Sequence, residues 1–264
     1  MAASISDTHA PAGDAILVIG HGTREPQGIA QLHQFVDQLR DALAPRLVAP
    51  AFLEFAQPTI PEAIDTLTGA GATRVVAAPL LLFAAGHALR DIPELLADAE
   101  RTHSRIEFRQ ARCLECHPAV VELSALRYRE ALAAADRSGA DDRDTLLLFV
   151  GRGSREPEAN AEMFRFARLR FEATPVAWLE VCFTALAEPS LERGLEIAAA
   201  LPFGRVVVQP HLLFDGQLRQ RIEHGVAATR RSCPQKEWIV TEILGPHRLL
   251  LEAVRELAAT AASR

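Results

Sequence analysis

Short aliphatic runs alternate along the chain with segments in which apolar residues recur every three or four positions. In the first half, the aliphatic runs predict strands over 15–20, 47–55, 74–82 and, more weakly, 106–110. Helical spacing is clearest at Ile29, Leu32, Val36, Leu39 and Leu43, and further helices are expected after Pro58 and Pro61, from about Asp91 and near His117. Strands that alternate with helices predict parallel sheets connected by right-handed crossovers.

The same pattern occurs twice, because the chain matches itself at an offset of 131 residues. The matching segments are ILVIGHGTREP (16–26) with LLFVGRGSREP (147–157), AFLEFAQPTIPEAI (51–64) with CFTALAEPSLERGL (182–195), and TRVVAAPLLLF (73–83) with GRVVVQPHLLF (204–214). After a one-residue slip, CHPAVVEL (116–123) also matches PHRLLLEA (246–253). A repeat this long exceeds the period of solenoid proteins and indicates a duplicated domain.

We therefore expect an α/β protein made of two similar three-layer αβα domains with parallel sheets. The N-terminal domain is expected over 15–135 and the C-terminal domain over 146–264. The polar segment DRSGADDRDT (136–145) between them suits a linker. Residues 1–14 lack the basic and apolar regions of a signal peptide, and we expect them to form a short disordered leader.

Composition narrows the class of protein. About half of the 264 residues are hydrophobic, and the net charge of −6 comes from charges of both signs spread along the chain. The lack of a basic block, together with a single Tyr and two Trp, argues against a nucleic-acid-binding surface. The longest uncharged apolar stretch is too short to span a bilayer, and four cysteines do not make a disulfide framework. We expect a cytoplasmic protein that binds neither nucleic acid nor membranes.

Three polar side chains follow strands of the first domain, at the edge where parallel sheets bind ligands. His21 follows the first strand, Glu54 lies near the end of the second and His87 lies just past the third, with 33 residues between successive members. Two neutral imidazoles and a carboxylate suit a divalent first-row metal ion, as ligands or as bases. The alternatives are a backbone hydrogen bond in a tight turn for His21, and a helix cap or an ion pair with Arg24 or Arg90 for Glu54.

The segments that carry these residues, GHGTREP, FLEFAQP and PLLLFAAGHALRDIP, resemble the three signature segments of the CbiX/SirB family of class II chelatases. The resemblance extends over residues 15–262 and implies two similar domains that face each other across a cleft. It also implies a lyase activity, the insertion of Co²⁺ or Fe²⁺ into sirohydrochlorin on the route to cobalamin or sirohaem. On this resemblance, His21, Glu54 and His87 are the metal-site and catalytic residues. One departure is Gln57, where related sequences often have Glu.

The second copy of the repeat has lost these residues. Arg152 matches His21, Ala185 matches Glu54, and either Gln217 or Leu218 matches His87. An arginine keeps its proton and cannot ligate a metal ion. The C-terminal domain is therefore expected to carry a degenerate site and to serve as a wall of the cleft.

The chemistry of metal insertion agrees with this set of residues. Water must be stripped from the ion and two pyrrole protons must be removed, and histidines can both ligate a metal and accept a proton near neutral pH. The macrocycle carries many carboxylates, so arginines have a reason to line the cleft, and the substrate-binding candidates are Arg24, Arg90, Arg152, Arg155 and Arg219. The expected partners are sirohydrochlorin and a divalent metal ion, which is a substrate and not a permanently bound cofactor.

We expect a monomer, because the duplication supplies both lobes of the cleft. The sequence leaves the choice between cobalt and iron open, and with it the choice between the cobalamin and sirohaem routes, because the ligand set accepts both metals. The alternative function is a non-catalytic carrier of a metal or a tetrapyrrole. The presence of His21, Glu54 and His87 in one lobe alone favours catalysis, because binding without catalysis would not need these bases at the edge of the sheet.

The segment CLECH (113–117) matches the C-x-x-C-H pattern of covalent haem attachment. The lack of an export signal argues against haem, and the match with Pro246 and His247 in the second copy suggests that His117 starts a helix. We interpret Cys113 and Cys116 as buried, unreactive thiols, with a redox or metal-binding role as the alternative.

Overall fold

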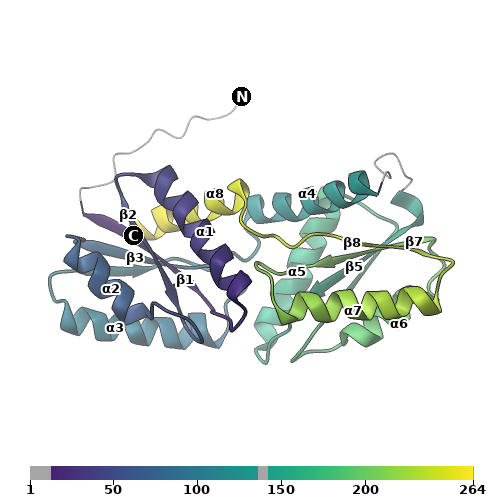
Figure 1. Cartoon of the computed structure of the whole chain (residues 1–264), viewed down its shortest axis with the longest axis horizontal. Coiled ribbons are helices and arrows are strands. Elements are labelled where there is room, and N and C mark those ends of the chain that lie inside the picture. Colours follow the sequence, from purple (N-terminus) through teal and green to yellow (C-terminus); the bar gives the residue numbers. More distant parts are fainter. Residues whose placement is uncertain (1–12, 136–141, 264) are drawn as a thin grey trace.

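The computed structural model describes residues 13–135 and 142–263, which form two α/β lobes side by side (Figure 1). Most of the expected leader (1–14) and linker (136–145) lies outside these ranges, so both expectations stay predictions. Where the structure does describe residues of these two segments, Asp14 begins the first strand, and Asp142–Asp144 form a short 3-10 helix before the fifth strand. Within the two ranges, no helix is long and apolar enough to cross a membrane.

In the described ranges, each half contains four strands and four α-helices in the same order. The first half consists of β1 (Asp14–Gly20), α1 (Pro26–Leu43), β2 (Leu47–Phe52), α2 (Ile60–Gly69), β3 (Arg74–Pro79), the π-helical turn η1 (His87–Asp91), α3 (Ile92–Thr102), β4 (Glu107–Gln110) and α4 (Pro118–Ala134). The second half consists of β5 (Thr145–Gly151), α5 (Pro157–Ala173), β6 (Trp178–Phe183), α6 (Leu191–Ala200), β7 (Arg205–Pro210), α7 (Gln217–Ser232), β8 (Glu237–Val240) and α8 (Arg248–Ala262). All strand pairs are parallel, in the orders β2-β1-β3-β4 and β6-β5-β7-β8. The predicted fold class is confirmed.

Buried strand residues alternate between the two faces of each sheet. In β1, where every residue is buried, Leu17 and Ile19 pack with α2 and α3, whereas Ile16 and Val18 pack with α1 on the opposite face. Helices cover both faces of such a sheet, so its central strands must be apolar throughout. This is why the strands appear in the sequence as continuous aliphatic runs.

The last helix of each half covers the sheet of the other half. Helix α8 packs against β3, β4 and α1, while α4 packs against α5 and β8. Figure 1 shows the yellow helix α8 within the N-terminal lobe and the teal helix α4 over the C-terminal lobe. In the core of the second lobe, Tyr128 and Leu132 of α4 pack with Leu147 and Val207. The expected boundaries at 135 and 146 divide the repeat in sequence, whereas each packed lobe takes its last helix from the other half.

Two strands end earlier than the apolar runs predict. β2 ends at Phe52 instead of residue 55, and β3 ends at Pro79 instead of residue 82. After these ends, Phe55 and residues 80–83 line a cavity, whereas Leu53 and Ala56 pack against the core. Part of the apolar character of both runs therefore belongs to a cavity wall and not to a strand.

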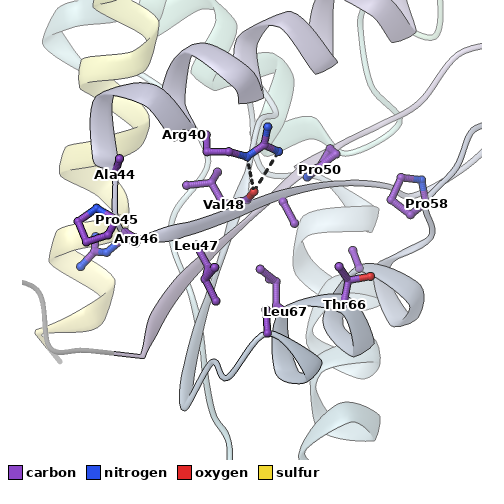
Figure 2. A pocket seen from close by; sticks show the side chains of 13 residues that line it. Arg40, Ala44, Pro45, Arg46, Leu47, Val48, Pro50, Pro58, Thr66 and Leu67 are labelled. Atoms are coloured by element: carbon purple, nitrogen blue, oxygen red, sulfur yellow. Dashed lines mark hydrogen bonds between the residues drawn. The ribbon is translucent and has the colours of Figure 1, made fainter.

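The outer edge of the first sheet is closed to further strand pairing (Figure 2). Arg40 of α1 donates hydrogen bonds from Nε and Nη2 to the carbonyl oxygen of Val48, at 3.3 and 3.2 Å, and Pro50 has no N–H to donate. A hollow of about 430 Å³ lies between this edge, the end of α1 and α2. It shares no lining residue with the cavity between the lobes.

Candidate active site

The loops that follow the strands of both sheets enclose a cavity of about 1100 Å³ between the lobes. Its lining includes Gly20 and Gly151 at the ends of β1 and β5, and residues 80–83 and 211–214 directly after β3 and β7. Parallel α/β sheets bind ligands at this end of their strands. The volume is at the upper limit for drug-sized ligands, so the cavity suits a larger molecule shared by the two lobes.

His21 lies at the carboxyl end of β1, where it lines the cavity and is half-buried. Its carbonyl oxygen accepts a hydrogen bond from the backbone N–H of Glu54 at 3.0 Å. Gly22 has a positive φ of 90°, and a Cβ atom there would lie 1.8 Å from the carbonyl oxygen of Glu54. A glycine is therefore required at this position for the loops after β1 and β2 to pack against each other.

Glu54 lies two residues after Phe52, the last residue of β2, and its side chain is exposed. It is not among the residues that line the cavity. The structure thus brings Glu54 next to His21 through the main chain.

His87 is the first residue of η1, between Gly86 and Ala88, which both line the cavity. Its side chain lies outside what the structure describes. Among the side chains that are described, no three of His, Cys, Asp or Glu come together to form a metal site. The three-residue metal site therefore stays a prediction. A π-helical turn within the segment that bears His87 is a feature found frequently at functional sites.

The second lobe repeats this backbone geometry around different residues. The N–H of Ala185 donates to the carbonyl oxygen of Arg152 at 2.9 Å, as that of Glu54 does to His21. A Cβ atom on Gly153, at a φ of 86°, would lie 2.0 Å from the carbonyl oxygen of Ala185. The predicted correspondences of Arg152 with His21 and of Ala185 with Glu54 are confirmed.

All five candidate arginines line the cavity, but their guanidinium groups are engaged to different degrees. Arg219 contacts Asp215, Glu223 and Glu242 at 2.8, 2.8 and 3.0 Å. Partial burial opposes its charge, but these carboxylates raise the pKa of Arg219 above its ordinary value. Its charge is therefore already balanced within the protein.

The remaining arginines are more accessible to a ligand. Arg90 makes an exposed ion pair with Glu156 at 3.4 Å. In the described part of the chain, Arg152 and Arg155 have no ion pair. An uncompensated guanidinium group at a cavity wall favours the binding of carboxylates.

Sequence reasoning missed His211, which also lines the cavity. It directly follows β7, at the position of Leu80 in the first copy. Its ring packs 4.2 Å from that of Phe166 and 5.1 Å from that of Phe149, measured between centroids. Burial lowers the pKa of His211 to about 3, and within the described ranges neither ring nitrogen has a hydrogen-bond partner. The strand-end argument applied to His21 and His87 would have found it, had it been applied to the second copy.

Both cysteines of CLECH carry raised pKa values, which keep their thiols protonated at neutral pH. Cys113 is buried, and burial raises its pKa to about 12. Cys116 is half-buried, and burial together with the charge of Glu162 raises its pKa to about 11. His117 is the N-cap of α4 and His247 the N-cap of α8, so the predicted role of His117 at a helix start is confirmed.

Comparison with known proteins gives consistent matches over nearly the whole chain. The model of the CbiX family matches residues 15–131 and 146–261. A sirohydrochlorin ferrochelatase of Priestia megaterium is 30% identical over 234 residues, which are 89% of this chain and 85% of that protein. A sirohydrochlorin cobaltochelatase of the same organism is 29% identical over 245 residues, 92% of this chain and 78% of that protein. The structure of SirB from Bacillus subtilis with Fe³⁺ superimposes with a TM-score of 0.83 at 24% identity, and covers 95% of this chain and 98% of that one.

Proposed function

The chain belongs to the CbiX family, and from this premise we propose that it is a sirohydrochlorin chelatase, a lyase that inserts Co²⁺ or Fe²⁺ into this tetrapyrrole. The observation that carries the proposal is the cavity between the lobes, into which the strand ends of both sheets open. A planar macrocycle needs two walls, and the duplicated fold provides one wall from each half.

His21, Glu54 and His87 are proposed to receive the metal ion and the pyrrole protons. The proposal is supported by the position of all three in the segments that follow β1, β2 and β3 of one sheet, with His87 at the start of η1, and by the hydrogen bond that joins the main chains of His21 and Glu54. Neutral imidazole is a good ligand for Co²⁺ and Fe²⁺ and a good proton acceptor near neutral pH. Each pyrrole N–H bond that breaks gives its proton to a base of this group while the ring nitrogen bonds to the metal.

The arginines of the cavity are proposed to bind the carboxylates of the macrocycle. Arg152 and Arg155 are the strongest candidates, because among the described residues no carboxylate pairs with them and, unlike Arg24, neither lies over an aromatic ring. Arg24 and Arg90 are also available at the cavity wall, whereas Arg219 is engaged by three carboxylates of the protein. An arginine forms two parallel hydrogen bonds with a carboxylate, which fixes the orientation of the ligand.

Three further points belong to the same proposal. The first half of the repeat (15–135) supplies the metal-site residues, and the second half (146–264) supplies a wall with a degenerate site. The protein acts as a monomer, since its own two lobes enclose the cavity, and the metal ion passes through it as a substrate. The four cysteines, all without a disulfide bond, support a place of action in the reducing cytoplasm.

The proposal is tested by an anaerobic assay of the purified protein with sirohydrochlorin and Co²⁺, Fe²⁺ or Ni²⁺ in turn, followed by absorbance. Acceleration of insertion above the uncatalysed rate is expected, and the metal with the highest kcat/KM identifies the preferred substrate. Binding of sirohydrochlorin without acceleration would instead identify a carrier.

A further inference from the structure

Both lobes contain the same unusual turn next to the cavity. After β2, the N–H of Ala56 donates to the carbonyl oxygen of Glu54 at 2.8 Å, around Phe55 with a φ of 63°. After β6, the N–H of Ala187 donates to the carbonyl oxygen of Ala185 at 2.8 Å, around Leu186 with a φ of 60°. A hydrogen bond between residues i and i+2 around a positive φ defines the rarer and more strained form of the γ-turn. Bulky side chains are disfavoured there.

The two strained residues also expose large apolar side chains. Phe55 is 57% exposed and Leu186 is 51% exposed. Both line the cavity, one from each lobe. Neither the backbone strain nor the exposure contributes to folding, and strained residues persist at sites where a ligand requires them. Their occurrence at equivalent positions of the repeat indicates a shared role.

Backbone hydrogen bonds join each turn to the end of the central strand and to the residue that follows it, which is His21 in the first lobe and Arg152 in the second. In the first lobe, the N–H of Leu53 donates to the carbonyl oxygen of Gly20 and the N–H of Glu54 to that of His21, both at 3.0 Å. The equivalent bonds hold the turn of Leu186 in the second lobe. The positions of the two apolar side chains are therefore set relative to His21 and its counterpart.

The two side chains differ in a way that makes the walls unequal. The guanidinium group of Arg24 lies 5.0 Å from the centre of the Phe55 ring, so this wall presents an aromatic face together with a positive charge. Leu186 has no ring and cannot form the same contact with Arg155, the counterpart of Arg24. One wall is aromatic and cationic, and the other is aliphatic.

We propose that Phe55 and Leu186 are paired substrate-binding residues that hold the planar tetrapyrrole between the lobes by apolar contact with its ring system. The inference rests on the proposed function and adds to it the residues that bind the apolar part of the substrate, while the arginines bind its carboxylates. Burial of the exposed parts of the two side chains against the macrocycle provides the binding free energy that offsets the strain of the turns.

The test compares Phe55→Ala and Leu186→Ala with matched variants outside the cavity, Phe164→Ala and Leu169→Ala. Phe164 is 49% exposed and Leu169 is 39% exposed, and neither lines the cavity. The Kd of metal-free sirohydrochlorin, measured by absorbance titration, and its KM are expected to rise about tenfold in each cavity variant. The KM for Co²⁺ is expected to stay near the wild-type value in the cavity variants. The two control variants are expected to keep the wild-type Kd and KM for sirohydrochlorin.

Glycine variants separate the role in binding from a role in folding. Phe55→Gly and Leu186→Gly remove the same side chains from positions where glycine is unstrained. We expect them to bind sirohydrochlorin as weakly as the alanine variants and to unfold at a temperature no lower than wild type. Weak binding together with a lowered unfolding temperature would overturn the proposal, because the side chains would then be structural.

The remaining outcomes distinguish this inference from the proposed function. If wild type binds and metallates sirohydrochlorin while the cavity variants keep their Kd and KM, the role of Phe55 and Leu186 is excluded and the proposed function stands. If the control variants lose as much affinity as the cavity variants, the role is also excluded. If wild type neither binds nor metallates sirohydrochlorin, both proposals fail.

Discussion

Gln31 of the N-terminal lobe and Asp215 of the C-terminal lobe are joined by two hydrogen bonds. The backbone N–H of Asp215 donates to Oε1 of Gln31 at 2.8 Å, and Nε2 of Gln31 donates to Oδ2 of Asp215 at 2.5 Å. Gln27 donates to the same carboxylate at 3.1 Å. Helix α1 is thereby tied to the segment between β7 and α7. A second link across the cavity wall, between Arg90 and Glu156, is a single exposed ion pair at 3.4 Å.

Loss of the contact between Gln31 and Asp215 is expected to destabilise the protein. Gln31→Ala removes two partly buried hydrogen bonds and should lower the free energy of unfolding by about 1–3 kcal/mol. Arg90→Ala removes an exposed ion pair and should change it little. Urea unfolding measures both values, and hydrogen exchange should show faster opening of the segment around Asp215 in Gln31→Ala alone. Equal losses in the two variants would contradict the assignment of Gln31 as the stronger link.

The two copies of the repeat provide a matched test of the metal-site residues. His21→Ala and His87→Ala should lower kcat for metal insertion by about 10²-fold or more, because each removes a proposed ligand and base. Arg152→Ala changes the equivalent position of the second lobe and should raise the KM for sirohydrochlorin while kcat at saturation falls much less. Circular dichroism checks that all three variants are folded. A loss of kcat in Arg152→Ala as large as that in His21→Ala would place the second lobe in the chemistry.

Gly22 and Gly71 separate backbone strain from a steric clash. Both have a positive φ, of 90° and 93°, but a Cβ atom on Gly22 would lie 1.8 Å from the carbonyl oxygen of Glu54, whereas one on Gly71 would meet nothing within 4 Å. Gly71→Ala should therefore cost only the strain, about 1–2 kcal/mol, and leave activity unchanged. Gly22→Ala should cost more and abolish activity, because the loop that bears Glu54 must move. Thermal unfolding and the insertion assay measure the two effects, and similar behaviour of both variants would refute the importance of this close approach.

His211 should make the protein less stable as the pH falls. Its pKa is about 3 in the folded protein because it is buried, against about 6.5 in the unfolded chain, so between these values the unfolded state binds one proton more. The free energy of unfolding should fall by about 1.4 kcal/mol per pH unit below pH 6.5 from this residue alone. His211→Phe, which suits the aromatic surroundings, should remove this part of the slope between pH 6.5 and 5 in urea unfolding. The exposed His224→Phe serves as control, and an unchanged slope in His211→Phe would show that the imidazole is solvated.

The hydrophobic pattern predicted the elements well and the ends of two strands poorly. The aliphatic run from Arg74 continues past Pro79, since residues of a sheet and residues of a cavity wall are both apolar. The same ambiguity moved the expected end of β2 from Phe52 to residue 55. Strand starts were predicted closely, because at those ends charged residues such as Arg74 and Glu107 mark the change to solvent.

The resemblance predicted that the two domains face each other across a cleft, but the exchange of their last helices could not be predicted from the sequence. Helices α4 and α8 each carry an apolar face, but nothing in their residues specifies which sheet that face covers. The full pairing of Arg219 was also hidden, because Glu242, one of the three carboxylates that balance its charge, lies in the segment after β8, far from α7 in the sequence. The repeat comparison succeeded at Arg152 and Ala185 because both lie in loops whose backbone hydrogen bonds are the same in the two copies.

The exchange of α4 and α8 predicts the behaviour of the isolated N-terminal half. A fragment ending at residue 140 keeps α4 but loses α8, which packs against β3 and β4 in the intact chain. The part of its sheet that α8 covers, including Val76 and Ala78 of β3, would be exposed to water. We expect two copies to associate so that α4 of each covers the sheet of the other, which light scattering after size-exclusion chromatography would detect as a dimer. A monomeric fragment that unfolds cooperatively would contradict this packing.

The exchanged helices also bear on how such a chain can arise. A gene for half of this length, whose product dimerises by exchanging its last helix, needs only tandem duplication and fusion to yield the arrangement of α4 and α8, with no change in packing. The ancestral pair would have had two equivalent sites at one shared cavity. After fusion, the two halves are encoded by separate parts of one gene and can change independently. Substitutions such as those at Arg152 and Ala185 can therefore accumulate in one half while the other retains His21 and Glu54. Covalent linkage thus turns a symmetric pair into an enzyme whose two walls can evolve independently.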